Sequence, residues 1–249
     1  MKRFVSFDGL GIAYDVLGDG PAVLMHHGFA SSSVTNWVRP GVAAAVVGAG
    51  RRVVLIDARG HGESDKPHEP AAYANGAMVS DVRALFDHLG LESVDVVGYS
   101  MGSYVAMSLA PVEPRVRSLV LGGAGLGQTI RRPENMLRVA EALEAEDSGA
   151  VTDATARAFR NFADATGSDR LALAAVRRGE GPPLTRESLR SISVPTLVVN
   201  GTEDALVHGT ESLADVIPNA RFESVPGNHL SAVVKPEFRQ AIVTFLDCL

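Results

Sequence analysis

The stretch Val94–Ser103, with the sequence VDVVGYSMGS, indicates the fold because it predicts a buried strand that leads into a helix through a tight turn. Val94–Val97 is a short apolar run typical of a strand, and the helical pattern Ser103–Ala110 follows within a few residues. A strand that runs directly into a helix is the repeating unit of α/β folds. The sequence therefore predicts an α/β unit centred on residue 100.

The turn itself has the pattern Gly98-Tyr99-Ser100-Met101-Gly102. In a sharp strand-to-helix turn, a central serine takes strained backbone angles and its hydroxyl stands free of the sheet. The same sharpness crowds the positions two before and two after the serine, and glycine supplies the necessary room at both. The flanking strand and helix make this short pattern specific, so we expect Ser100 to be a nucleophile.

Similar apolar runs recur on both sides of this unit and predict an opening hairpin followed by six more strands. The central runs are apolar without alternation, as in a parallel sheet that is covered on both faces. Helical stripes lie between several of them, notably at 78–89, 103–110 and 238–246. The sequence thus predicts an α/β fold with a mostly parallel eight-stranded sheet and helices on both faces. The predicted strands are 4–7, 12–17, 22–25, 52–56, 94–97, 119–121, 196–199 and 222–225.

One segment interrupts this alternation, since no convincing strand lies between Leu121 and Pro195. Residues 131–146 and 152–178 are rich in Ala, Glu, Arg and Leu and predict helices. We expect a helical lid inserted between two strands, placed over a ligand site. The predicted division is a core formed by residues 1–125 and 194–249, with a lid formed by residues 126–193.

Composition excludes several classes of protein. The chain has 249 residues with 23 basic and 29 acidic side chains, a net charge of −6, so the basic footprint of a nucleic-acid-binding protein is absent. One cysteine, Cys248, cannot form an internal disulfide, and no Cys/His cluster has metal-site spacing. No secretory signal or long apolar span is visible. We expect a cytoplasmic protein that needs no membrane, metal or cofactor; the sequence does not indicate its oligomeric state.

A serine hydroxyl needs a base to remove its proton, and the base needs a carboxylate to orient it. His229 lies in a loop between the last predicted strand and the final helix, where its side chain can return to the strand end that carries Ser100. Asp204 follows the strand 196–199, and Glu203 is its immediate neighbour. Either acid can orient His229 on this reasoning.

The tetrahedral intermediate of acyl transfer needs two donors aimed at its oxyanion. The turn fixes one of them, the backbone N–H of Met101. The loop after the strand 22–25 supplies the second, and the N–H of Phe29 is the candidate because Gly28 allows the backbone to turn there. We expect His26 and His27 to pack behind this loop rather than to take part in catalysis.

These motifs together resemble the α/β-hydrolase superfamily over essentially the whole chain, in its serine-dependent esterase and lactonase-like branch. The segment 57–67, DARGHGESDKP, resembles the family's loop after the fourth strand, and the segments 201–204 and 227–229 resemble its acid and histidine loops. The resemblance implies the chain order Ser100, Asp204, His229 and so favours Asp204 over Glu203. It also implies that Asp57 and His61 are structural.

The resemblance implies a serine hydrolase that cleaves a small or medium carboxylic ester or lactone, with a small-molecule acyl substrate as its partner. Serine members of the family also cleave carbon–carbon bonds of diketo acids, and Arg177 or Arg178 could then bind the substrate carboxylate, although a solvated surface is the more common place for such residues. A perhydrolase is disfavoured because Phe29 stands where tryptophan is frequent. A small-molecule receptor is the remaining alternative.

Overall fold

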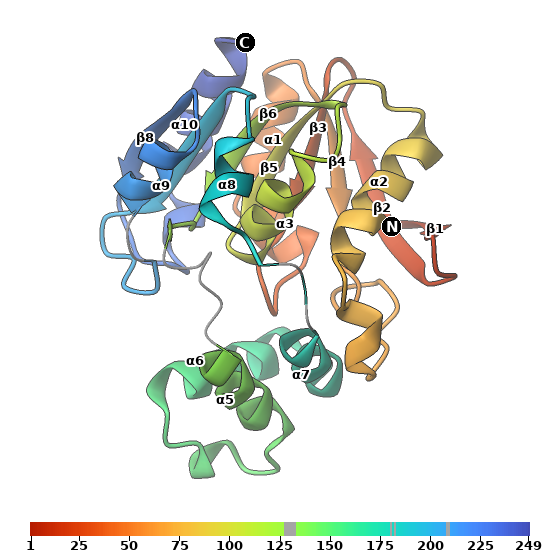
Figure 1. Cartoon of the computed structure of the whole chain (residues 1–249), viewed down its shortest axis with the longest axis vertical. Helices are drawn as coiled ribbons and strands as arrows, with labels where there is room; N and C mark the ends of the chain where they lie inside the picture. Colours follow the sequence, from red (N-terminus) through yellow and green to blue (C-terminus); the bar gives the residue numbers. More distant parts are fainter. Residues whose placement is uncertain (127–132, 180, 182, 208–209) are drawn as a thin grey trace.

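A single eight-stranded sheet forms the centre of the molecule in the computed structural model, which describes residues 1–126, 133–179, 181, 183–207 and 210–249 (Figure 1). The strand order is β1-β2-β4-β3-β5-β6-β7-β8. The first two strands are antiparallel to their neighbours, and all later pairings are parallel. The predicted fold class is therefore confirmed. The strands are β1 (Lys2–Val5), β2 (Gly11–Leu17), β3 (Ala22–His26), β4 (Arg52–Ile56), β5 (Val94–Tyr99), β6 (Val116–Gly122), β7 (Thr196–Gly201) and β8 (Ala220–Val225).

Helices cover both faces of this sheet and enclose two apolar cores. On one face, α2 (Ala77–Leu89) and α3 (Met101–Leu109) pack on the sheet together with α8 (Arg186–Arg190) and α9 (Thr210–Val216). On the other, α1 (Val42–Gly48) and α10 (Pro236–Asp247) pack on it. Successive residues of a strand point to opposite faces, so the wholly buried strands β3 and β5 are mainly apolar on both. Asp95 of β5 is the charged exception, and it is hydrogen-bonded to Arg117 and Ser118. This arrangement explains why the central strands show apolar runs without alternation.

Strands β1 and β6 differ most from their predicted bounds. β6 covers residues 116–122 rather than 119–121, because the polar side chains of Arg117 and Ser118 interrupt the apolar run near its start. β1 covers residues 2–5 rather than 4–7, because Phe7 lies in the turn and its ring stacks on the Arg59 guanidinium, 5.2 Å from the ring centroid. β8 begins at Ala220, two residues before the predicted start. β8 is a half-exposed edge strand, so its polar side chains hide the strand from a search for apolar runs.

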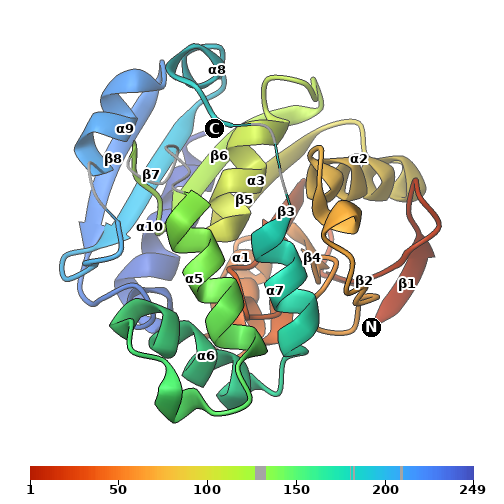
Figure 2. The ribbon, with the colours of Figure 1, turned by 60° about the horizontal axis from the view of Figure 1, so that its bottom comes forward.

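Between β6 and β7 the chain forms the helices α5 (Pro133–Glu144), α6 (Ala154–Thr166) and α7 (Arg170–Arg178), which enclose a third apolar core together with Phe29 and Ala30 of the loop after β3. These helices lie across the end of the sheet at which the parallel strands finish (Figure 2). We call them the helical insertion. Residues 131 and 132 of the predicted helix 131–146 lie outside the described residues. The domain division at residues 126 and 193, and a lid function for the insertion, stay predictions.

Shorter helical turns complete the chain: η1 (Val34–Val38), η2 (Pro70–Tyr73), η3 (Ser148–Ala150) and η4 (Ala232–Val234). Across the described ranges, we find no helix with the length and apolar character that a membrane crossing requires. The same ranges contain no group of three or more His, Cys, Asp or Glu side chains arranged to hold a metal ion.

Candidate active site

Ser100 occupies the turn between β5 and α3 with φ 51° and ψ −108°, angles that few non-glycine residues adopt. The two flanking glycines are required by close backbone contacts. A Cβ atom on Gly98 would lie 2.4 Å from the carbonyl of Gly102, and one on Gly102 would lie 2.0 Å from the carbonyl oxygen of His26. The start of α3 therefore lies so close to the ends of β3 and β5 that only glycine fits at positions 98 and 102, as the sequence pattern predicts.

Ser103 also fixes this turn, a role that the sequence pattern around Ser100 does not predict. Its buried hydroxyl lies 2.9 Å from the carbonyl oxygen of Gly98 and 2.8 Å from that of Gly122. The backbone N–H of Ser100 also donates to Gly122, at 2.8 Å. These bonds tie the turn to the neighbouring strand β6. The serine that follows Gly102 in the sequence is the signal that could have indicated this role.

The structure brings Ser100, His229 and Asp204 into one hydrogen-bonded chain. His229 Nε2 lies 3.0 Å from Ser100 Oγ, and His229 Nδ1 lies 2.7 Å from Asp204 Oδ2. The side chains of His229 and Asp204 are 10% and 1% exposed. Glu203, the alternative acid, is an exposed residue. The arrangement can transfer a proton from Ser100 to His229 and hold the resulting imidazolium next to a carboxylate.

Tyr99 fixes the position of the loop that carries His229. Its hydroxyl donates to the carbonyl oxygen of His229 at 2.6 Å, and its ring packs 5.6 Å from the imidazole. Burial raises the pKa of the Tyr99 hydroxyl, so Tyr99 stays a neutral donor. A residue adjacent to the nucleophile thus positions the base.

The loop after β3 is held on both sides of Gly28. The Gly28 N–H donates to Asn36 Oδ1 at 3.0 Å, and its carbonyl oxygen lies 2.7 Å from His27 Nδ1. Because the Gly28–Phe29 peptide is trans, the N–H of Phe29 points away from that carbonyl oxygen. Neither Phe29 N–H nor Met101 N–H donates to an acceptor within the residues that the structure describes. Both amides can therefore receive an oxyanion.

His27 is held in one tautomer by its two hydrogen bonds. Nε2 accepts the N–H of Ala58 at 3.0 Å, so the ring proton is on Nδ1 and is donated to Gly28. Burial lowers the pKa of His27 and lowers that of His26 to about 3. Both rings are buried and uncharged, in keeping with the packing role expected for them. His27 in addition sets the orientation of the Phe29 amide.

The loop after β4 supports the same region from the other side. Asp57 accepts the N–H groups of Ser33 and Glu63 at 2.8 and 2.9 Å, so one carboxylate ties together two loops. His61 packs edge-on against the ring of Phe29, with centroids 5.7 Å apart, and burial keeps the His61 pKa well below its ordinary value. Asp57 and His61 therefore take the structural places that the family resemblance implies.

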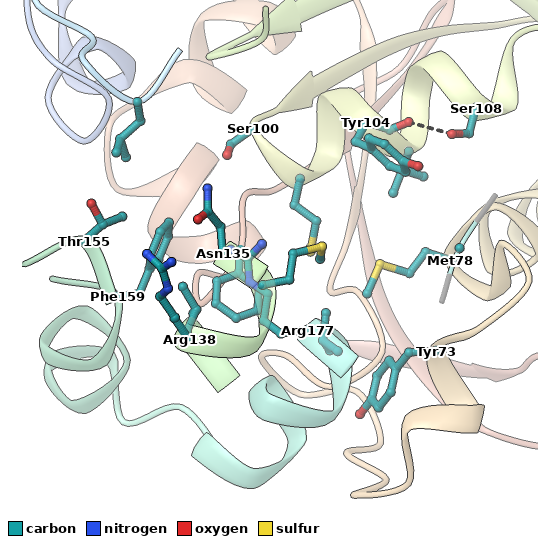
Figure 3. A pocket seen from close by; sticks show the side chains of 18 of the residues that line it. Tyr73, Met78, Ser100, Tyr104, Ser108, Asn135, Arg138, Thr155, Phe159 and Arg177 are labelled. Carbon is teal, nitrogen blue, oxygen red and sulfur yellow. Dashed lines mark hydrogen bonds between the residues drawn. The ribbon is translucent and has the colours of Figure 1, made fainter. Parts of the chain in front are cut away.

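Two cavities meet at Ser100 and His229. The larger has a volume of about 780 Å³ and lies between α3, the N-terminal end of α2 and the helical insertion. Figure 3 shows Arg177 between Ser100 and the pair Met78 and Tyr73, whereas Arg138 lies on the other side of the cavity, beside Phe159 and Thr155. The smaller has a volume of about 360 Å³ and lies between α6, the loop after β3 and the His229 loop.

Arg177 lies in the larger cavity, and the expectation of a solvated position is wrong for this residue. Its guanidinium is 3.8 Å from the ring centroid of Phe29 and 5.1 Å from that of Phe159. Its neighbour Arg178 does lie at the surface, where it pairs with Glu144 at 2.7 Å. Position 177 of α7 faces Phe29 in the loop after β3, and a run of two arginines does not reveal which of them turns inward.

Comparison with known proteins identifies the family. The chain belongs to the alpha/beta hydrolase fold family, whose model matches residues 21–179. It is 31% identical to a non-heme haloperoxidase from Rhodococcus erythropolis over 91% of this chain and 92% of the relative. Two solved structures are also similar. A hydrolase from Pseudomonas aeruginosa has 28% identity, a TM-score of 0.78 and coverage of 98% and 97% of the two chains. A thermophilic esterase from Thermogutta terrifontis has 27% identity, a TM-score of 0.77 and coverage of 99% and 98%.

Proposed function

We propose that the protein is a serine hydrolase that cleaves a small or medium carboxylic ester or lactone through an acyl-enzyme. The observation that carries the proposal is the hydrogen-bonded chain from Ser100 through His229 to Asp204, next to two unused backbone amides. The similar thermophilic esterase supports the choice of an ester substrate. The substrate is a small-molecule acyl compound, because the site opens into cavities rather than onto a flat surface.

The proposed reaction follows from this geometry. Ser100 Oγ attacks the acyl carbon while His229 Nε2 accepts the hydroxyl proton, and Asp204 stabilises the imidazolium that forms. The amides of Phe29 and Met101 bind the oxyanion. His229 then protonates the leaving alcohol, and water, activated by the same histidine, releases the acid from Ser100.

The test is the hydrolysis of a p-nitrophenyl ester series from acetate to octanoate by the wild-type protein and Ser100→Ala. Turnover by the wild-type protein should fall by about 10⁶-fold in the variant. The chain length with the highest kcat/KM would report the size of the acyl site. Equal turnover by both proteins would contradict the proposal.

A second candidate is the cleavage of a carbon–carbon bond in a diketo acid, and the position of Arg177 favours it. A guanidinium can bind a carboxylate with two parallel hydrogen bonds, and Arg177 lines the same cavity as Ser100. Rapid loss of a coloured ring-fission diketo acid, together with negligible ester turnover, would support this candidate. Ester turnover that exceeds diketone turnover would leave the first proposal in place.

The haloperoxidase relative supports one further test of the same acyl-enzyme. Hydrogen peroxide can replace water in attacking the acyl carbon, and the product is then a peroxy acid. Halide oxidation by the protein with acetate and peroxide, measured beside ester hydrolysis, compares the two acceptors directly. Halide oxidation that survives in Ser100→Ala would exclude a serine acyl-enzyme as its source.

A further inference from the structure

The smaller cavity differs from the larger one in its chemistry. Among the described residues that line it, none is an Asp, Glu, Lys or Arg, whereas the larger cavity carries Arg138, Asp153 and Arg177. Phe29 and Phe159 line both cavities and pack edge to face, 5.7 Å apart. The two cavities therefore offer a substrate one environment without charged side chains and one that contains them, joined at the nucleophile.

One face of helix α6 forms an apolar wall of the smaller cavity. One side of this helix packs within the insertion through Ala156, Arg160 and Ala163, which are buried. A second side turns five uncharged residues toward the cavity, four of them apolar: Ala154, Thr155, Ala158, Phe159 and Phe162. Exposed alanines at positions 154 and 158, one helical turn apart, leave space there that a larger side chain would fill.

The position of the smaller cavity relative to the base indicates which part of a substrate occupies it. Leu230, Val233 and Val234 follow His229 directly in the chain and line the smaller cavity but not the larger one. The larger cavity instead runs along α3 past Met101 and Tyr104, on the side of the nucleophile. A general acid must reach the departing oxygen, so the leaving group lies on the side of the base.

We propose that the smaller cavity is an apolar subsite for the leaving group, so that the substrate is an ester of a hydrophobic alcohol whose acyl part lies in the larger cavity. This assignment rests on the proposed function and deepens it. When the bond between the acyl carbon and the ester oxygen breaks, that oxygen takes the proton from His229. Leu206, Leu230 and Val234 line the subsite and are 42%, 59% and 50% exposed, so its outer edge is open to solvent and apolar.

The experiment compares two ester series in the wild-type protein, Ala158→Leu and Ala154→Leu. In one series the acetyl group is constant and the alcohol grows from methanol to hexanol. In the other, the methyl alcohol is constant and the acyl chain grows. Either leucine should lower the hexyl-to-methyl ratio of kcat/KM by about 10-fold or more in the alcohol series, as expected when a pocket loses room for a few methylenes. The control is Asn161→Leu, an exposed residue of the same helix outside both cavities.

Each outcome decides a different point. A loss of selectivity in the acyl series alone would reverse the assignment of the two cavities. Unchanged ratios in both series, from leucine variants that unfold at the wild-type temperature, would show that the cavity binds no substrate group, while Ser100-dependent turnover would keep the proposed function. Absence of Ser100-dependent turnover of every ester would remove the proposed function and the subsite together.

Discussion

His27 donates a hydrogen bond from Nδ1 to the carbonyl oxygen of Gly28 over 2.7 Å, across the peptide whose N–H belongs to Phe29. Replacing His27 by Ala removes this bond, so the Phe29 amide should lose its fixed direction. We expect kcat to fall by about 10- to 100-fold with little change in KM, less than the loss of a complete oxyanion donor. Esterase kinetics of the purified variant measure this.

The matched variant His27→Asn keeps a donor near the position of Nδ1 and should recover part of the lost kcat. A purely structural role for His27 would instead lower the amount of folded protein without changing kcat per folded molecule. Titration of active sites with a serine-directed phosphonate separates the two results.

Asp204 and Glu203 form a direct test of the orienting acid, because they are adjacent and only Asp204 contacts His229, at 2.7 Å. Asp204→Asn should lower kcat by roughly 10⁴-fold, since the amide favours the wrong imidazole tautomer. Glu203→Gln, at an exposed position, should retain nearly full activity. Comparable losses in the two variants would contradict the assignment of Asp204.

The buried histidines make stability depend on pH. Burial lowers the pKa of His26, His27 and His61 below the ordinary value of 6.5. The unfolded chain therefore binds more protons than the folded one as the pH drops below 6.5, and the free energy of unfolding falls. We expect a loss of roughly 1 kcal/mol per histidine between pH 6.5 and 5.5. Urea unfolding at both pH values measures it, and His61→Asn should reduce the pH-dependent loss by about a third.

Arg59 is a fully buried cation, and its removal should be costly. It binds Asp81 through two hydrogen bonds of 2.7 and 2.6 Å and also contacts Asp8 at 2.8 Å. Arg59→Ala leaves the buried Asp81 carboxylate without this partner and should lower the free energy of unfolding by about 3–5 kcal/mol. Arg178→Ala, which breaks a partly exposed pair, should cost about 1 kcal/mol or less. Equal costs for the two variants would contradict this view of burial.

The glycines can be ranked by the same kind of comparison. Gly102→Ala places a methyl group 2.0 Å from the carbonyl oxygen of His26, so we expect loss of activity together with a lower unfolding temperature. Gly48→Ala lies in α1, and apart from its chain neighbours and the backbone of its own helix no atom lies within 4 Å of the new methyl group, so the change should raise stability by about 0.5–1 kcal/mol. Thermal unfolding of both variants, with an ester assay, checks the contrast.

The sequence predicts those elements that depend only on a short segment of the chain. The apolar run before Ser100, the two glycines around it and the loop positions of Asp204 and His229 each follow from short segments, and the parallel order of strands then brings them together. The apolar runs predict starts for β8 and β6 that lie two and three residues too late, because exposed or polar side chains occupy the first residues of both strands. Such strand segments lack the apolar signature that a prediction of this kind needs.

The supporting contacts could not be predicted in the same way. Asn36 reaches Gly28 from the turn η1, and nothing in residues 34–38 indicates that an asparagine there holds a loop eight residues earlier. Arg177 likewise shows no local sign of facing Phe29, because its orientation depends on how α7 packs against the core. Such side chains depend on three-dimensional neighbours that no sequence window contains.

The turn that carries Ser100 is held by contacts that do not involve the serine hydroxyl. Gly102 packs closely against the carbonyl group of His26, the Ser103 hydroxyl binds two backbone carbonyl oxygens, and the backbone N–H of Ser100 donates to Gly122. The position of the side chain at residue 100 therefore does not depend on the hydroxyl group that makes it reactive. The backbone of this turn directs the side chain at position 100 toward His229, and a different side chain at that position would point the same way. A thiol introduced there would serve as an anchoring point for probes or catalysts, with the exposed Cys248 removed beforehand.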